Sequence, residues 1–318
     1  MGEAYIVESI RTPGGRRKGA QAGWHPADLG AEILNALVAR TGIDPAAIDE
    51  VIMGCVTKAG EQAFNVGRNA VLASVLPETV PGVTVDRQCG SSQQALHFAA
   101  QAVMSGVQDM VLAARVESMT RVPMFADMTV FEEAGIGKAA VSPRIRERYG
   151  VASFSQFGGA EAIAAKHGLR REALDAYALT SHLRAAAATE SGAFAREILP
   201  LAMAGDQHLR DEGIRFDATA DAIGGVEPLT EGGLLSAANA SQICDGASGA
   251  LIVSKRALAT HGLTPLARVV DMTVIAGDPV IMLEEPIAAT RRALEKSGMA
   301  LKDIDLFEVN EAFALVAT

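Results

Sequence analysis

The chain has 318 residues, with 38 acidic and 28 basic side chains and a formal net charge of −10. This length suggests two domains, and the hydrophobic content of 49% excludes a disordered chain, since that much apolar surface can form a core. The acidic balance argues against a nucleic acid partner, because a phosphate backbone attracts a basic surface. No apolar run approaches the roughly 20 residues of a membrane span, so we expect no membrane partner.

The chain contains three cysteines, Cys55, Cys89 and Cys244, whose spacing does not resemble that of metal ligands. We therefore expect no metal site and no bound cofactor. A sparse, odd number of cysteines without a secretory signal indicates a reducing compartment, and we expect a cytoplasmic protein. One basic cluster, Arg16 to Lys18, is either a solvated loop or a local anion contact.

The N-terminal third of the sequence alternates short apolar runs with amphipathic segments. The predicted strands are residues 5–7, 50–53, 83–85 and 110–113, and the predicted helices are residues 28–40, 62–75 and 92–104. Asp28 is expected to cap the first helix and Gly42 to end it. This alternation predicts an α/β fold with a largely parallel sheet.

A different pattern occupies residues 117–243, where charged and small residues mix and β-branched runs are few. Helices are expected over residues 156–167 and 171–190, and the sheet resumes at 250–253. We interpret the intervening stretch as a large insertion with helices of its own.

An internal repeat relates Gly42–Val51 to Gly298–Phe307. Both segments follow an amphipathic helix, carry an Ile-Asp pair at the same place and are expected to lead into a strand. The repeat indicates a duplicated fold. On this interpretation the counterpart of Cys89 would lie beyond Thr318, and the second half is expected to be incomplete.

Cys89 is the candidate nucleophile among the three cysteines. It lies between a predicted strand and a predicted helix, where the positive end of the helix dipole favours the reactive thiolate. The small residues Gly90, Ser91 and Ser92 leave room for a substrate. For Cys55 and Cys244 we expect the ordinary role of a small core residue.

Several motifs around these residues resemble those of one enzyme family. The segment from Asp86 to Ala95, DRQCGSSQQA, resembles the nucleophile motif of the thiolases. The segment from Ser236 to Ala247 resembles their pantetheine-contacting loop, and Asn310–Phe313 looks like their NEAF motif. Weaker matches begin at Arg11 (RTP) and Glu117 (ESM). These motifs occur in the family's order.

The resemblance implies an acyltransferase that cleaves 3-ketoacyl-CoA with CoA or condenses acyl-CoAs, in fatty acid or steroid side-chain β-oxidation. Coenzyme A is then a substrate. Cys89 would carry the acyl group, and Asn310 would hold a water for an oxyanion site. Ala240 and Ser241 would contact pantetheine and Phe313 would line the acyl pocket. Gln156, with Phe157, stands about where short-chain enzymes have a His-Met pair, which suggests a longer or bulkier acyl group.

The resemblance also implies a fold of duplicated βαβαβαββ halves in an αβαβα arrangement, assembled as a homodimer or homotetramer. Residues 1–117 and 246–262 would form the N-terminal half, 118–245 a CoA-covering loop domain, and 263–318 the first part of an incomplete C-terminal half.

The sequence departs from the family pattern in three places. Ser92 and Ala238 stand where glycine is usual, and the His-containing Gly-His-Pro and the C-terminal Cys-x-Gly motifs are absent. We expect His97 to pack inside the fold, and His167 and His182 to be exposed, so none would activate Cys89. This predicts little or no turnover. The alternative is a non-catalytic CoA-binding subunit or one completed by a partner; a ketoacyl synthase is disfavoured by the NEAF motif.

Overall fold

The computed structural model describes residues 2–137, 140–203 and 205–318. Two compact units are formed, each from discontinuous segments. The first contains residues 1–136, 192–213 and 243–269, and the second contains residues 137–191, 214–242 and 270–318. The three-part division expected from the sequence stays a prediction. Among the described residues, no helix combines the length and the apolar character needed to cross a bilayer.

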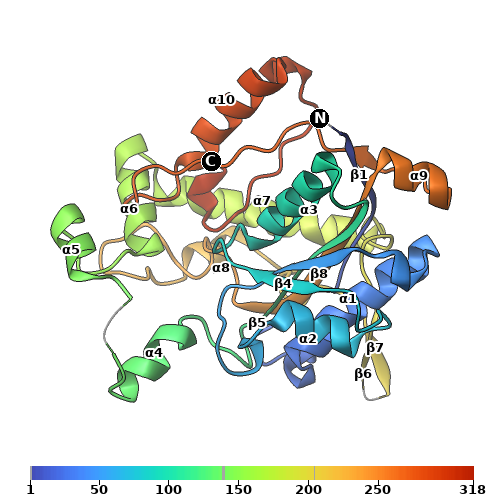
Figure 1. The fold of residues 1–318 in the computed structure, drawn as a ribbon. Helices are drawn as coiled ribbons and strands as arrows, with labels where there is room; N and C mark the ends of the chain where they lie inside the picture. The colour runs from blue at the N-terminus through green and yellow to red at the C-terminus, as the bar shows by residue number, and fades with distance from the viewer. Residues whose placement is uncertain (1, 138–139, 204) are drawn as a thin grey trace. The chain divides into compact units, whose positions relative to one another are not determined.

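The first unit is built on a mixed sheet (Figure 1). Its strands lie in the order β4 (Gly82–Val85), β3 (Glu50–Gly54), β5 (Met110–Ser118), β8 (Cys244–Ser254), β1 (Ala4–Arg11) and β9 (Ala267–Arg268), and the short β2 (Gly15–Arg16) pairs with β8. All four strands expected near the N-terminus are present.

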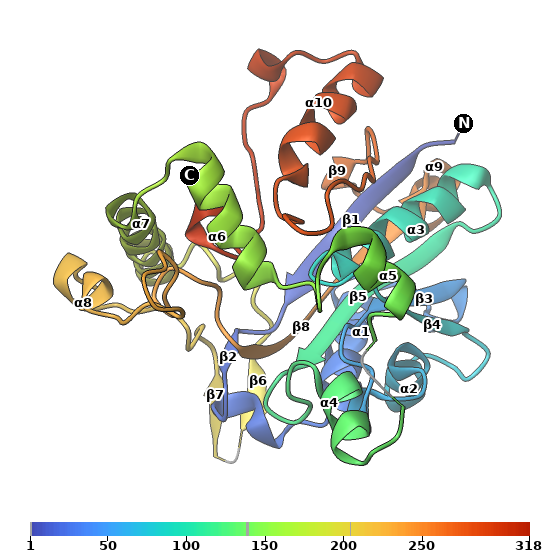
Figure 2. The same ribbon diagram turned by 90° about the vertical axis from the view of Figure 1, so that its left-hand side faces the viewer.

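The expectation of a largely parallel sheet was wrong. Strands β4, β3 and β5 are parallel, but β8 runs antiparallel to both β5 and β1. Figure 2 shows β5, β8 and β1 side by side. A short crossover helix between two strands makes them run parallel. Strand β8, in contrast, follows a long connection over residues 119–243, which does not constrain its direction.

Helices cover both faces of this sheet: α1 (Pro26–Thr41) and α2 (Val66–Ala73) on one side, and α3 (Ser91–Ser105) on the other (Figure 1). Helix α1 ends where expected, at Gly42 in the left-handed conformation (φ 67°). Its cap, however, is His25, whose side chain accepts a hydrogen bond from Ala27 N, and Asp28 lies within the first turn. Pro26, which sequence periodicity missed, starts the helix earlier because proline suits a first helical position.

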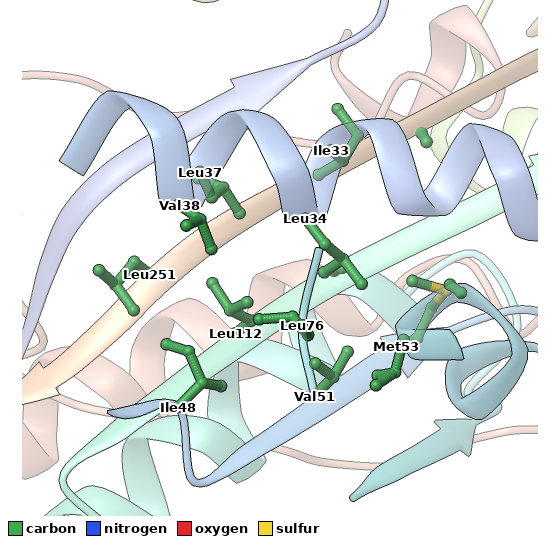
Figure 3. Close-up of a cluster of buried hydrophobic side chains, with 14 of the residues drawn as sticks. Ile33, Leu34, Leu37, Val38, Ile48, Val51, Met53, Leu76, Leu112 and Leu251 are labelled. Carbon is green, nitrogen blue, oxygen red and sulfur yellow. The ribbon is translucent and has the colours of Figure 1, made fainter. Parts of the chain in front are cut away.

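The core of the first unit lies between α1, α2 and one face of the sheet. Figure 3 shows side chains of α1 directed at the strands. The cluster includes Ile33, Leu34, Leu37 and Val38 of α1, with Val51, Met53, Leu112 and Leu251 from the sheet. Met110, Leu112, Ala114 and Val116 of β5 all belong to it. Since side chains alternate along a strand, Ala113, Arg115 and Glu117 project from the opposite face, which α3 covers.

The first unit has several shorter elements besides these. They are α4 (Ala126–Glu133), the hairpin of β6 (Leu201–Met203) and β7 (Asp206–His208), and α9 (Lys255–His261), with 3₁₀ turns at Ala20–Gly23, Pro45–Ala47 and Gly60–Gln62.

The second unit is helical. It contains α5 (Pro143–Tyr149), α6 (Gln156–His167), α7 (Arg171–Glu190), α8 (Ala220–Gly224) and α10 (Glu285–Ser297), with 3₁₀ turns at Leu301–Asp303 and Ala314–Val316. Helices α6 and α7 have the bounds expected from the sequence. Both pack around the buried segment from Ala312 to Leu315 (Figure 2).

The strand expected after the second copy of the repeat does not form. Residues 304–310 follow the 3₁₀ turn without regular structure, and Leu306 is 89% exposed. In the first copy, β3 is stabilised by hydrogen bonds to β4 and β5. No neighbouring strand in the described part of the chain offers residues 304–310 such partners, and an apolar sequence alone does not make a strand.

Gly54 allows the end of β3 to approach the start of α3. A Cβ atom at Gly54 would lie 2.6 Å from the Ser91 carbonyl carbon and 2.9 Å from Ser92 N. These are backbone atoms and cannot rotate away, so only glycine permits this spacing.

We expect Gly54→Ala to lower the free energy of unfolding by about 1–3 kcal/mol, because the added methyl overpacks a backbone contact. Urea denaturation measures this change. The control is Gly23→Ala in the same unit, where a Cβ has open space and the change should stay within about 0.5 kcal/mol. Equal midpoints for the two variants would contradict the steric argument.

Candidate active site

The turn that carries Cys89 connects β4 to α3. Gln88, which directly precedes Cys89 in this turn, has a positive φ of 48°. Gln88 N donates to Asp86 Oδ1 at 2.8 Å, and the Ser91 hydroxyl donates to Gln88 O at 2.6 Å. Arg87 N in turn donates to Ser91 Oγ at 2.9 Å. A non-glycine residue with positive φ is costly unless its surroundings fix it, and these bonds supply that support.

Cys89 is exposed and lies directly before the N-terminal end of α3, with Gly90 at the cap position. The first N–H groups of a helix lack partners within it and carry the positive end of its dipole. The expected placement of the Cys89 side chain, between a strand and a helix start, is therefore confirmed. A thiol in this position is accessible to a substrate.

Arg115 contacts the turn from strand β5. Its Nη1 donates to the Cys89 carbonyl oxygen at 3.0 Å, and its Nη2 lies 3.5 Å from Glu117 Oε2. Sequence reasoning missed Arg115, because nothing in the order of residues places it beside Cys89. The alternation of side chains along β5 was the available signal, since it puts residues 115 and 117 on the same face.

Glu117 is the centre of a buried network at the carboxyl ends of β3 and β5. Its carboxylate accepts hydrogen bonds from Val56 N (2.9 Å), Thr57 N (3.2 Å) and Gln62 Nε2 (2.9 Å). The side-chain oxygen Oε1 of Gln62 accepts from Ser118 N at 2.6 Å. The weak match that begins at Glu117 thus corresponds to a residue that ties the loop after β3 to the end of β5.

The other two cysteines differ from each other. Cys55 is buried in the core as expected, and burial, followed by the charge of Glu117, raises the pKa of its thiol to about 12. Cys244 was expected in the core as well, but it is exposed. It is the first residue of β8 and pairs there only with Arg16 of the two-residue β2, so the sheet covers it poorly.

The three histidines singled out in the sequence occupy different environments. His97 is buried on α3, as expected, and His167 is exposed, with Nε2 2.6 Å from Glu284 Oε1. His182 was expected to be exposed but is half-buried, with Nδ1 accepting from Arg215 N at 3.3 Å. Burial, then the Arg215 charge, lowers the pKa of His182.

The second unit brings two of the sequence motifs together. Ser241 N donates to Ala312 O and Ala314 N donates to Asn239 O, both at 2.9 Å, and Ala240 forms an antiparallel bridge with Phe313. The loop around Ala240 and Ser241 therefore runs alongside the end of the NEAF segment. Two stretches about 70 residues apart in sequence form a single backbone ladder.

Asn239 anchors that ladder to α7. Its Nδ2 donates to Asp175 Oδ1 at 2.9 Å and to Leu234 O at 3.1 Å, while its Oδ1 accepts from Ser236 N at 2.9 Å. Asp175 is itself paired with Arg171 at 2.7 Å. Each polar group of the buried amide has a partner, so the loop conformation is well determined.

Phe313, expected to line a pocket, is buried in the core of the second unit and packs edge-on against Phe157, with ring centroids 5.5 Å apart. Gln156 is half-buried at the start of α6.

Asn310 is exposed, and its carbonyl oxygen accepts from Ala312 N at 2.9 Å. The neighbouring Glu311 carboxylate accepts from the Tyr177 hydroxyl (2.6 Å) and Ser181 Oγ (2.9 Å) of α7. Burial and Glu311 raise the pKa of Tyr177 to about 12, so the hydroxyl remains a donor at neutral pH. These bonds hold the NEAF backbone and leave the Asn310 side chain at the surface of its unit.

Comparison with known proteins agrees with these motifs. Residues 4–256 match the family model "Thiolase, N-terminal domain", and residues 263–318 match "Thiolase, C-terminal domain". The chain belongs to the thiolase family. It is an acyltransferase, and its α/β thiolase fold matches the crystal structure of the Bacillus anthracis acetyl-CoA acetyltransferase (TM-score 0.87, 33% identity, covering 100% of this chain and 82% of that one).

Two curated relatives illustrate the range of similar thiolases. The steroid 3-ketoacyl-CoA thiolase FadA6 of Mycobacterium tuberculosis is 50% identical over 317 residues, which cover 99% of this chain and 78% of that protein. The 3-oxoadipyl-CoA/3-oxo-5,6-dehydrosuberyl-CoA thiolase of Escherichia coli K12 is 38% identical over 332 residues, covering 100% and 82%. The expectation of little turnover is not borne out by these similarities, and none of them favours a non-catalytic thiolase.

Proposed function

We propose that this thiolase transfers acyl groups between 3-ketoacyl-CoA and CoA through an acyl-enzyme on Cys89. The observation that carries the proposal is the exposed Cys89 thiol directly before the N-terminus of α3. The names of the relatives support the same reaction, since both describe thiolases that act on 3-keto (3-oxo) acyl-CoA esters.

In the cleavage direction, the Cys89 thiolate attacks the C3 carbonyl and the C2–C3 bond breaks. The departing CoA ester takes a proton at C2, and the acyl group remains on sulfur. The thiol of free CoA then attacks this thioester, which releases the shortened acyl-CoA and regenerates Cys89. Thiol-to-thioester exchange replaces one bond by another of the same kind, so the covalent intermediate splits one difficult step into two easier ones.

We assign the remaining roles from the motifs. Asn310 holds a water that stabilises the thioester oxygen while C2 carries negative charge, and the backbone N–H of Cys89 serves a second oxyanion site. Ala240 and Ser241 contact pantetheine, and Phe313 borders the acyl group. Gln156 is assigned to the same substrate site, because it directly precedes Phe157, which packs against Phe313. The Asn239 and Asp175 contacts support these assignments, because they fix the loop that would meet pantetheine.

For the substrate class we propose an acyl group larger than acetoacetyl, of fatty acid or steroid side-chain origin. The support is the Gln156-Phe157 pair together with the name of the 50% identical relative. Thiolysis rates of acetoacetyl-CoA and of a polycyclic 3-ketoacyl-CoA compare the two classes. A higher kcat/KM for acetoacetyl-CoA would contradict the assignment.

We further propose a cytoplasmic homodimer or homotetramer. The support for the compartment is that all three cysteines are free thiols. The support for assembly is that β4 forms an unpaired edge of the sheet in the described part of the chain, since proteins usually cover such edges. Sedimentation velocity measures the assembly, and a monomer at micromolar concentration would contradict it.

Cys89→Ala should abolish acyl-enzyme formation, because no sulfur remains to carry the acyl group. The measurement is incubation with acyl-labelled acyl-CoA, rapid quenching and mass mapping of the labelled peptide. Cys244→Ala is the matched control, since Cys244 is the other exposed cysteine and should be dispensable. Label retained by Cys89→Ala, or lost in Cys244→Ala alone, would refute the assignment.

Asn310→Ala should lower kcat for thiolysis about 100- to 1,000-fold, the usual cost of an oxyanion donor. Acylation of Cys89 by a simple acyl-CoA forms no carbanion at C2, so that step should keep its wild-type rate. The two rates are measured by steady-state thiolysis and by quenched-flow labelling. Equal losses in both would show that Asn310 does not act on the carbanion.

A further inference from the structure

We infer that Arg115 is a positioning residue for the candidate nucleophile, acting through the Cys89 carbonyl. The inference rests on the proposed role of Cys89. The guanidinium reaches this carbonyl at 3.0 Å from the neighbouring strand, and its side chain is 25% exposed. A hydrogen bond from a charged donor is among the stronger ones a carbonyl can accept.

Sheet geometry explains why the Arg115 side chain on β5 reaches the turn that carries Cys89. Residues 110, 112, 114 and 116 face the core beneath α1, so Arg115 projects toward the side of α3. In the parallel register, Arg115 lies opposite Gly54, whose missing side chain admits the Ser91 backbone. Arg115 and the start of α3 are thus placed together by the same strand pair.

The peptide between Cys89 and Gly90 is held at both of its polar groups, since Gly90 N donates to Arg87 O at 3.1 Å and the Cys89 carbonyl accepts from Arg115. The Cys89 carbonyl belongs to the peptide between Cys89 and Gly90, so holding it fixes ψ of Cys89. On the other side, the preceding peptide is fixed by the contacts of Gln88 O with Ser91. With the peptides on both sides held, the direction of the Cα–Cβ bond, and hence of the thiol, is set.

Glu117 does not need Arg115 for its own stability. Its carboxylate already accepts three hydrogen bonds of 2.9–3.2 Å from Val56 N, Thr57 N and Gln62, whereas the Arg115 contact is 3.5 Å. The shorter bond of Arg115 is the one to Cys89. Glu117 therefore orients the guanidinium, and the orientation serves the nucleophile turn.

The test compares Arg115→Met, which keeps an unbranched but shorter side chain and removes charge and donors, with Arg115→Lys and a control, Arg68→Met. Arg68 also donates to backbone carbonyls, of Val80 and Glu78, but away from Cys89. In the full chain, the rate of Cys89 acylation by a labelled acyl-CoA is measured in single turnovers, alongside KM and thermal unfolding.

We expect Arg115→Met to slow acylation about 10- to 100-fold, as misplacement of a reacting group does, with KM within about twofold of wild type. Arg115→Lys should recover part of the rate, and Arg68→Met should acylate normally even if it unfolds at lower temperature. Acylation of Arg115→Met at the wild-type rate, or losses that follow thermal unfolding in all variants alike, would overturn the inference.

Two further outcomes are distinguishable. If Arg115→Met does not fold, Arg115→Lys and Arg115→Gln carry the test, and failure of all three to fold would overturn a positioning role in favour of a structural one. If wild-type protein forms no acyl-Cys89, the proposed function fails and this inference fails with it. If the wild type forms acyl-Cys89 and Arg115→Met forms it equally fast, only the inference about Arg115 is overturned.

Discussion

The arrangement of the first unit around its candidate nucleophile depends on one buried carboxylate, Glu117. Its carboxylate accepts hydrogen bonds from two backbone N–H groups of the loop after β3 and from the amide of Gln62. These bonds join the carboxyl ends of β3 and β5. A carboxylate removed from water must be satisfied in this way, since an unsatisfied buried polar group costs about 1–3 kcal/mol and a charged one more. Because Glu117 is satisfied by its loop, it can also orient Arg115 toward the turn that presents Cys89. The Glu117 carboxylate thus contributes both to the stability of the first unit and to the placement of the Cys89 thiol.

The second unit uses a side-chain amide for a similar purpose. Residues 239–241 and 312–314 form a short ladder without the support of a sheet, and such a ladder alone is marginal. Asn239 ties it to Asp175 of α7, and Tyr177 and Ser181 on the same helix hold Glu311. Helix α7 is therefore the rigid element on which the loops of this unit are built. Loops supported in this manner can expose residues such as Asn310 while their backbones stay fixed.

Much of the fold was readable because local patterns and global packing agree. The apolar periodicity of residues 28–40 is preserved as the buried face of α1, and the expected bounds of α6 and α7 are confirmed. The sequence predictions were wrong where contacts with other segments of the chain determine the local structure. Residues 304–310 have strand-like composition, but no strand among the described residues pairs with them. Cys244 is apolar enough for a core, but it lies at the start of β8, where the short β2 covers it poorly. The direction of β8 depends on a connection too long to constrain it.

The sequence by itself determined the α/β alternation, the family resemblance and the candidate residues, since short-range periodicity and motif order are properties of the chain. Only the tertiary structure decided that Arg115 reaches the Cys89 carbonyl, that Glu117 collects its partners from the loop after β3, and that residues 239–241 lie beside 312–314. These contacts join residues 26 to about 70 positions apart. Their existence depends on strand register and helix packing, which are set by the burial of many side chains together and not by any local pattern.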